Sequence, residues 1–451
     1  MRVSVPRSFS IKNFGCRATQ ADGAAIAAEL ARRGLQLEGN PKDSDLVVVN
    51  TCTVTAEADR DARQSINRIH RENPAAEILV TGCYAQRRPE ELSLLGGVKW
   101  VVGNSHKHKI GQVVAPDLVQ IDGAGPQPLS YHGGIQAGGT LVGDLTQHSG
   151  LASIPAGDPI GRSRPNVKVQ DGCDNRCSFC VIPSVRGKGR SAATEAVIRD
   201  VRRLERSYPE VVLTGINLGR WGRDLDGRPR FPQLIEALLA ETSVRRIRLS
   251  SIEPMDWSER LLGLMASSGR IARHVHMPLQ SGSDAVLRRM RRRYRVRHYE
   301  GRVALASRLL PAAAIGADVM VGFPGETDSE FEETRSFVER MPFTYLHVFS
   351  YSSRDGTQAA SLGGHLPKAI KRQRNRVLRE LIEKKNLAFR RRLLGMRVSA
   401  VALFSGETGA RALTDNFIEV TLPGAEVRPG ELVDVQIERV SDRSTIGALV
   451  R

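Results

Sequence analysis

The chain has 451 residues, room for about three domains of ordinary size, which excludes a peptide-sized or disulfide-stapled scaffold. Its 66 Lys and Arg outnumber its 49 Asp and Glu by 17, so a polyanion such as nucleic acid is the expected partner. With 41% hydrophobic and 25% charged residues, and no apolar run as long as a membrane span, an integral membrane protein is excluded. The first residues lack the apolar run and cleavage site of a secretory signal, so we expect a cytoplasmic location.

The first hundred residues alternate between short apolar runs and segments of helical periodicity, which is typical of a parallel sheet covered by helices. We expect strands over 8–14, 46–50 and 77–82, and helices over 21–33, 59–71 and 89–95. Residues 1–113 are therefore predicted to form an open parallel α/β domain.

A cysteine follows each of these three strands, namely Cys16, Cys52 and Cys83. Because the carboxyl ends of parallel strands meet at one edge of a sheet, the three thiols are expected to face a common site. The alternative is that they are separate small hydrophobic residues packed under helices, which is the usual environment of a free cysteine.

The remainder of the chain divides into three stretches. Residues 114–164 are rich in Gly, Pro, Ser and Gln and are expected to be a linker. Strand and helix patterns resume over 165–392, with strands at 167–170, 211–214, 246–250, 273–276, 316–321 and 345–350, which predicts an open or partial (βα)6 barrel. Residues 393–451 show short alternating strands such as 416–422 and 431–437, and predict a small closed β-barrel.

Directly after the strand at 167–170 stand Cys173, Cys177 and Cys180. A closed zinc site or a fully cysteine-ligated iron-sulfur cluster normally has four ligands, and no fourth cysteine lies nearby in the sequence. Three cysteines at this spacing suit a four-iron cluster whose fourth iron is left open to bind a small molecule.

The spacing Cys-x3-Cys-x2-Cys, with Phe179 before the last cysteine, resembles the signature of the radical S-adenosylmethionine superfamily. The resemblance covers nearly the whole chain and is to the methylthiotransferases, most of all to the branch that modifies threonylcarbamoyladenosine beside the tRNA anticodon. Where that branch more often has a histidine, this sequence has Asn217. The motifs that carry the resemblance are Asn13-Phe-Gly-Cys16, Asn50-Thr-Cys52-Thr-Val-Thr, Thr81-Gly-Cys83-Tyr-Ala-Gln, Pro278-Leu-Gln280-Ser-Gly-Ser283 and Asp318-Val-Met-Val-Gly322-Phe-Pro-Gly-Glu326. The closing β-domain is similar to a TRAM domain.

The resemblance implies that Cys173, Cys177 and Cys180 hold a 4Fe-4S cluster that cleaves S-adenosylmethionine, and that Cys16, Cys52 and Cys83 hold a second 4Fe-4S cluster. It implies methylthiolation at C2 of N6-threonylcarbamoyladenosine at position 37, with one S-adenosylmethionine giving the methyl group and another the radical. No catalytic residue apart from the cluster ligands is expected. The expected contacts to S-adenosylmethionine are Phe179, Gly215 near the methionine end, Glu253 at the ribose, Gln280, and Gly322 near adenine.

These contacts have a physical interpretation beside the resemblance. Gly215 and Gly322 end strands, and a residue without Cβ lets the backbone approach a ligand, although each glycine also suits the start of a loop. Glu253 can accept hydrogen bonds from hydroxyls, or it is a surface carboxylate in the turn before Pro254. His274 and His276 share a face of their strand, and without a carboxylate nearby in the sequence a structural role is favoured.

Two basic runs are candidates for phosphate contacts. Residues 288–297 hold seven Arg, and residues 368–392 hold eleven Lys or Arg against two Glu, with Arg390, Arg391 and Arg392 at the end. A solvated helix face is the alternative. Residues 393–451 have six Arg and eight acidic residues, a net charge of −2. The expected partners are a tRNA anticodon stem-loop and a reductase or flavodoxin-type electron donor, with no membrane and a monomeric chain.

Three other functions remain open. One is methylthiolation of isopentenyladenosine in tRNA. Another is the same chemistry on a ribosomal-protein side chain, which an acidic terminal domain would suit, although the motif after Cys16 lacks the Pro typical of that branch. The third, from a different class, is a non-enzymatic RNA-binding protein that contains a metal such as zinc.

Overall fold

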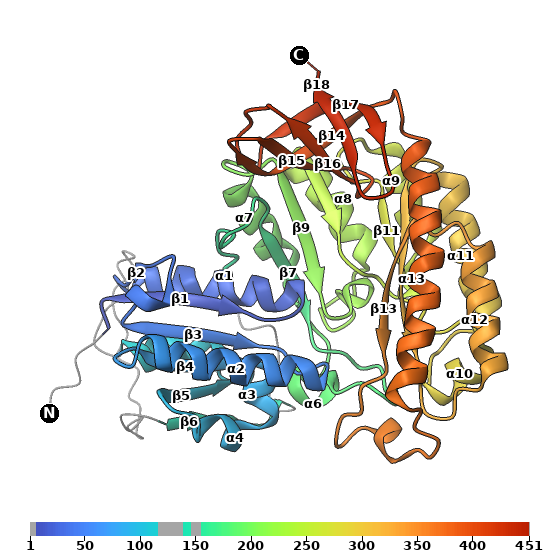
Figure 1. Cartoon of the computed structure of the whole chain (residues 1–451). Coiled ribbons are helices and arrows are strands. Elements are labelled where there is room, and N and C mark those ends of the chain that lie inside the picture. Colours follow the sequence, from blue (N-terminus) through green and yellow to red (C-terminus); the bar gives the residue numbers. More distant parts are fainter. Residues whose placement is uncertain (1–5, 116–138, 146–154, 451) are drawn as a thin grey trace, which may run out of the picture. The chain divides into compact units, whose positions relative to one another are not determined.

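The computed structural model describes residues 6–115, 139–145 and 155–450 (Figure 1). They form two compact units. The first contains the described residues up to Ile160 together with Asp171–Asn175 and Cys180–Arg190, and the second contains Gly161–Gln170, Arg176–Phe179 and the described residues from Ser191 onward. The predicted α/β fold class, with a closing β-barrel, is confirmed.

The first unit is built on a six-stranded parallel sheet in the order β2-β1-β3-β4-β5-β6. The predicted strands correspond to β1, β3 and β4, whereas β2, β5 and β6 were not predicted. The strand β6 lies inside the stretch expected to be a linker, and that part of the expectation is wrong. Three residues among many glycines give no periodic signal, so only pairing with β5 makes them a strand. The bounds are β1 Ser8–Asn13, β2 Gln36–Leu37, β3 Leu46–Thr51, β4 Glu77–Gly82, β5 Val98–Gly103 and β6 Gly139–Leu141.

Helices cover both faces of this sheet, and the central strand β3 shows why. Leu46 and Val48 belong to one apolar cluster, whereas Val47 and Val49 belong to another. A strand buried on both faces in this way is a continuous apolar run rather than an alternating one. The helices of the unit are α1 Arg17–Arg32, α2 Ala56–Glu72, α3 Cys83–Arg87, α4 Pro89–Ser93, α5 Ile110–Val114 and α6 Ile182–Arg186.

The second unit contains the six strands predicted for the partial barrel. Together with one short strand that was not predicted, β8, they form the ladders β10-β9-β7-β8 and β11-β12-β13, and a parallel bridge joins Ile247 to Ile271. The strands are β7 Asn166–Asp171, β8 Arg190–Ser191, β9 Glu210–Gly215, β10 Arg246–Leu249, β11 His274–His276, β12 Ala314–Val321 and β13 Tyr345–Ser350. The helices are α7 Thr194–Leu204, α8 Phe231–Glu241, α9 Glu259–Ser267, α10 Asp284–Arg289, α11 Val296–Leu309, α12 Asp328–Arg340 and α13 Lys368–Arg391.

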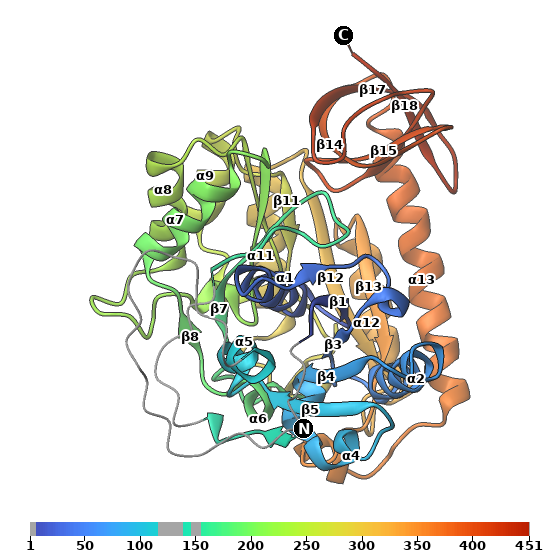
Figure 2. The same ribbon diagram turned by 90° about the vertical axis from the view of Figure 1, so that its left-hand side faces the viewer.

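The chain ends in the closed five-stranded barrel that the sequence predicts, and α13 leads directly into it (Figure 2). Phe389 of α13 packs into the barrel core with Ala400, Val420 and Val435. The strand order is β14-β15-β16-β18-β17. Their bounds are β14 Arg397–Gly406, β15 Gly409–Thr414, β16 Glu419–Pro423, β17 Leu432–Val440 and β18 Thr445–Leu449.

A buried carboxylate connects the sheet of the second unit to this barrel. Glu210 of β9 has no exposed surface and forms ion pairs with Arg164, Arg246 and Arg248. Arg248 also donates to the carbonyl oxygens of Thr414 and Asp415 in the barrel, at 3.0 and 3.1 Å.

Within the described ranges, no helix is both long enough and apolar enough to span a membrane.

Candidate functional site

The structure places Cys16, Cys52 and Cys83 at the carboxyl ends of three neighbouring strands. Cys16 caps the start of α1 shortly after β1, Cys52 directly follows β3, and Cys83 is the first residue of α3 after β4. These strands pair in parallel, with Asn13 opposite Asn50 and Asn50 opposite Thr81. The prediction that the three cysteines lie at one edge of the sheet is confirmed.

Glycines precede two of these cysteines and let the backbone pass close to its neighbours. Gly15 and Gly82 both have φ +97°, which favours glycine. A Cβ on Gly15 would lie 2.6 Å from the Cβ of Cys52 and 2.9 Å from its Sγ, and a Cβ on Gly82 would lie 2.3 Å from the carbonyl oxygen of Thr51. The chain segments before Cys16 and Cys83 pass close to the end of β3 and to Cys52, which follows it. This close approach depends on the two glycines.

Polar side chains fix the loops that carry the thiols. The amide of Asn50 donates to Asn13 Oδ1 at 3.0 Å and to the carbonyl oxygen of Thr19 at 2.7 Å. After Cys52, the hydroxyl of Thr53 donates to Asp59 Oδ1 at 2.6 Å. These bonds hold the strand ends in one arrangement, so the thiols are positioned before any ligand binds.

The environment of these thiols is that of a soft metal site. Cys52 and Cys83 are 7% and 3% exposed, and burial together with the neighbouring Cys83 and Cys16 raises the pKa of Cys52 to about 12. Such a thiol keeps its proton until a cation replaces it. Three converging cysteine sulfurs select iron-sulfur clusters or zinc over hard cations, so the residues fit the cluster that the resemblance implies.

A buried arginine that sequence reasoning missed lies beside this triad. Arg186 is 1% exposed, and its Nε donates to Cys83 Sγ at 3.2 Å. Its Nη1 donates to Asp171 Oδ1 at 2.8 Å and its Nη2 to Asp22 Oδ2 at 3.1 Å. The one sequence signal is that Arg186 directly follows a mostly apolar segment, residues 181–185, which itself begins right after Cys180.

Each cysteine of the second triad has a sulfur that accepts a hydrogen bond. Cys173 and Cys180, in the first unit, accept from the backbone N–H groups of Asn175 and Ile182 at 3.4 Å each. Cys177, in the second unit, accepts from Arg292 Nη1 at 3.1 Å. Hydrogen bonds to sulfur stabilise thiolates and tune iron-sulfur clusters, so each of these sulfurs, taken by itself, has the environment of a cluster ligand.

Arg292 also forms an ion pair with Glu253. Its side chain is 5% exposed and that of Glu253 is 24% exposed, so Glu253 is not the solvated surface carboxylate that its position before Pro254 allowed. Burial of the guanidinium is offset by Tyr294, Glu253 and Cys177, which hold the pKa of Arg292 well above its ordinary value. The basic run over 288–297 conceals this buried residue among exposed arginines.

The other residues expected to bind S-adenosylmethionine lie around the ends of the barrel strands. Phe179 is partly buried against an apolar cluster that includes Met320 and Phe323. Gly215 is the last residue of β9, where a Cβ would meet Gln170 at 3.0 Å. The backbone N–H of Gly322, directly after β12, donates to a Glu326 oxygen at 2.6 Å.

Gln280 has two unusual properties. It adopts φ +65° although it is not glycine, and it is 8% exposed. Within the part of the chain that the structure describes, its buried Oε1 has no hydrogen-bond partner. A buried acceptor of this kind normally has a partner, and a strained backbone is typical of a ligand site.

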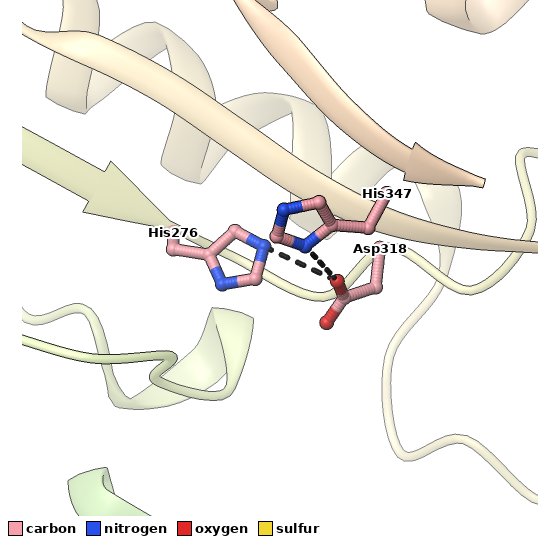
Figure 3. A group of neighbouring side chains, drawn as sticks. All are labelled: His276, Asp318 and His347. Carbon is pink, nitrogen blue, oxygen red and sulfur yellow. Dashed lines mark hydrogen bonds and ion pairs between the residues drawn. The ribbon is translucent and has the colours of Figure 1, made fainter. Parts of the chain in front are cut away.

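Three further polar side chains of the second unit lie close together, as Figure 3 shows. Asp318 Oδ1 lies 3.3 Å from His276 Nε2 and 3.1 Å from His347 Nδ1 (Figure 3). Although burial opposes ionisation, the two neighbouring histidines hold the pKa of Asp318 well below its usual range. The sequence interpretation missed this carboxylate because it comes from β12 rather than from the strand of His276; the signal is an acidic residue inside an apolar strand.

The structure divides the basic runs into exposed and paired residues. Arg390 is 7% exposed and donates to the carbonyl oxygens of Ser441 and Asp442, so the expectation that it contacts phosphate is wrong: its guanidinium instead satisfies the turn between two barrel strands. Arg289 pairs with Glu330. The exposed cations of α13 are Lys368, Arg372, Arg376, Arg379, Lys384 and Arg391, and those of the earlier run are Arg288, Arg291, Arg293, Arg295 and Arg297.

Comparison with known proteins agrees with this architecture. Residues 167–338 match the radical SAM superfamily, and residues 8–103 match the uncharacterized protein family UPF0004. The chain is 35% identical to the threonylcarbamoyladenosine tRNA methylthiotransferase MtaB of Aquifex aeolicus over 95% of this chain and 99% of that protein. It is 34% identical to MtaB of Bacillus subtilis, over 97% and 95% of the two chains.

A second group of relatives is named for another activity. The chain is 30% identical to the tRNA-2-methylthio-N(6)-dimethylallyladenosine synthase of Methylacidiphilum infernorum, over 98% of this chain and 94% of that protein. Among solved structures, the radical S-adenosylmethionine methyltransferase TsrM of Kitasatospora setae is 15% identical, has a TM-score of 0.52 and covers 78% of this chain and 77% of its own; this likeness shows the fold. The chain belongs to the radical S-adenosylmethionine methylthiotransferase family of transferases.

Proposed function

We propose that this chain adds a methylthio group to C2 of N6-threonylcarbamoyladenosine at position 37 of tRNA. The observation that carries the proposal is that relatives named threonylcarbamoyladenosine tRNA methylthiotransferases match nearly the whole chain. In this chain, three cysteines other than those of the Cys173 motif converge at the edge of the sheet. The relatives that act on dimethylallyladenosine are more distant, at 30% identity.

The two cysteine triads have separate roles in this proposal. When bound, the 4Fe-4S cluster of Cys173, Cys177 and Cys180 supplies the electron that cleaves S-adenosylmethionine to a 5′-deoxyadenosyl radical, and that of Cys16, Cys52 and Cys83 supplies the site where sulfur is methylated. Arg292 holds the Cys177 sulfur and orients Glu253, whose carboxylate accepts hydrogen bonds from the ribose hydroxyls.

Other residues of the chain would bind and enclose S-adenosylmethionine. The buried Oε1 of Gln280 offers an acceptor, and Gly322 and Gly215 let the backbone approach the adenine and methionine ends. Phe179, packed on its apolar cluster, would hold the segment that carries the cysteines in place.

The proposal also assigns partners and a location. The exposed cations of α13 and of the run over 288–297 would contact the phosphates of the tRNA anticodon stem-loop. Reduction would come from a reductase or flavodoxin-type donor, and the chain would act as a monomer in the cytoplasm.

The test uses anaerobically reconstituted protein and anticodon stem-loops that contain either threonylcarbamoyladenosine or dimethylallyladenosine at position 37. We expect about eight iron atoms per chain, because two triads imply two four-iron clusters, and methylthiolated product from the first RNA in nucleoside mass spectrometry. Product only from the second RNA would assign the chain to the other activity. Zinc in place of iron would favour the non-enzymatic RNA-binding protein.

Two triple variants separate the triads. Replacing Cys173, Cys177 and Cys180 by Ala should leave about half of the iron and abolish formation of 5′-deoxyadenosine. Replacing Cys16, Cys52 and Cys83 by Ala should preserve formation of 5′-deoxyadenosine and eliminate methylthiolated product. Methylthiolated RNA formed at the wild-type rate by the second variant would show that these three cysteines are only packing residues.

A further inference from the structure

A compact group of four buried charges lies within the first unit. Arg186 pairs with both Asp22 and Asp171, and Lys107 Nζ lies 2.6 Å from Asp22 Oδ2. The four side chains are between 1% and 10% exposed. Among these four side chains, the two cations balance the two carboxylates.

This charge group reaches the first triad through Cys83. The Nε of Arg186 donates to Cys83 Sγ at 3.2 Å, and a guanidinium keeps its proton in proteins. Arg186 thus remains a cation in a place where water does not screen its charge.

The helix that carries Arg186 is fixed against the same cysteine. Val181, Ile182 and Val185 form an apolar cluster with Cys83. The amide of Asn104 donates to the carbonyl oxygen of Val185 at 2.7 Å and contacts Cys83 Sγ at 3.6 Å. The short helix α6 begins two residues after Cys180, so one rigid segment connects a cysteine of the second triad to the environment of the first.

We propose that Arg186 is a positioning residue that sets the electron affinity of the cluster at Cys16, Cys52 and Cys83. This inference rests on the proposed function, because it requires a cluster at that triad. A hydrogen bond to a ligand sulfur and a nearby positive charge both stabilise an added electron, and hence raise the reduction potential. Arg186 supplies both, while α6 keeps the guanidinium at a fixed place beside the thiolate.

The charge count gives the proposal two predictions of opposite sign. Arg186→Gln leaves the buried group with one net negative charge, so the reduction potential of this cluster should shift to a more negative value. Asp22→Asn leaves one net positive charge, so the potential should shift to a more positive value. Arg186→Lys keeps the positive charge but lacks the forked guanidinium that bonds to Cys83, Asp171 and Asp22 together. Its reduction potential should therefore lie between those of the wild type and Arg186→Gln.

The experiment is a reductive titration of the reconstituted full-length protein followed by electron paramagnetic resonance. The variant in which Cys173, Cys177 and Cys180 are replaced by Ala retains only the cluster of the first triad, and so assigns its signal. The matched control is Arg33→Gln, because Arg33 is a buried arginine of the same unit that bonds to Glu29 and to the carbonyl oxygen of Ala115. The control should keep the wild-type potential.

The outcomes separate this inference from the proposed function. An unchanged potential in Arg186→Gln protein that retains the cluster would overturn the inference. If that variant fails to fold, Asp22→Asn decides, and an unchanged or more negative potential in it would overturn the inference as well. Absence of any second cluster in the wild-type protein would instead overturn the proposed function. A purely structural role for Arg186 would lower the melting temperature without moving the potential.

Discussion

Replacing Glu210 by Gln tests the buried charge network that joins the sheet of the second unit to its barrel. The substitution preserves the size of the side chain but removes the carboxylate with which Arg164, Arg246 and Arg248 all form ion pairs. Three guanidinium groups would then remain in a buried place without the negative charge that balances them. Removing one side of such a network is strongly destabilising, because it leaves the remaining charges buried and uncompensated.

The magnitude follows from the pKa of Glu210. Burial opposes ionisation, yet Arg248, Arg164 and Arg246 lower this pKa from its ordinary 4.5 to about 2. At about 1.4 kcal/mol for each pKa unit, the ionised carboxylate contributes about 3 kcal/mol to the free energy of unfolding at neutral pH. A domain of this size loses roughly 2–4 °C of melting temperature per kcal/mol, so Glu210→Gln should melt about 6–12 °C lower.

Calorimetry of the full-length protein at pH 7 measures this difference. The control is Glu236→Gln, because Glu236 pairs with Arg260 at the surface, where the side chains are 36% and 58% exposed, and such a pair contributes about 1 kcal/mol or less. Since the folded pKa of Glu210 is depressed, its contribution is complete above pH 4.5 and is lost as the pH falls toward 2. The difference in melting temperature between the wild type and Glu210→Gln should therefore become smaller as the pH falls from 4.5 toward 2. A variant that melts with the wild type at pH 7 would refute the reasoning.

Three more outcomes are expected. Gly15→Ala should lower the iron content by about half, because the new Cβ would lie 2.6 Å from the Cβ of Cys52. The control is Gly34→Ala, which is also at positive φ but has open space around it and should keep the iron. Equal iron content in both variants would contradict the geometry of the first triad. Charge reversal of Arg372, Arg376 and Arg379 on α13 should reduce the slope of log affinity for tRNA against log salt concentration by roughly one unit for each lost phosphate contact. Charge reversal of Arg199, Arg202 and Arg203 on α7 should leave this slope unchanged. A larger effect of the α7 variant would place the RNA elsewhere. Gln280→Asn should raise the Kd for S-adenosylmethionine by about tenfold, the cost of one buried hydrogen bond, because asparagine tolerates the positive φ but has a shorter side chain. The control, Gln233→Asn at the start of α8, should leave this Kd unchanged.

The sequence by itself determines the placement of all six cysteines relative to the strands. Cys52 and Cys83 directly follow strands that are continuous apolar runs, so their positions can be predicted from local pattern alone. Because parallel strands share an edge, three repeats of the same position also predict that the thiols converge. The strand β6 escaped prediction because three residues among glycines have no period to detect.

Only the tertiary structure decides which charged residues accompany those cysteines. Arg186 and Asp22 are 164 residues apart and Lys107 and Asp22 are 85 apart, so no local pattern relates them. The same holds for Arg390, which belongs to a basic helix in the sequence but bonds to a barrel turn about fifty residues later. Periodicity reports which face of an element is buried, whereas the partner of a buried charge depends on which distant segment packs against it, and that is settled when the chain folds.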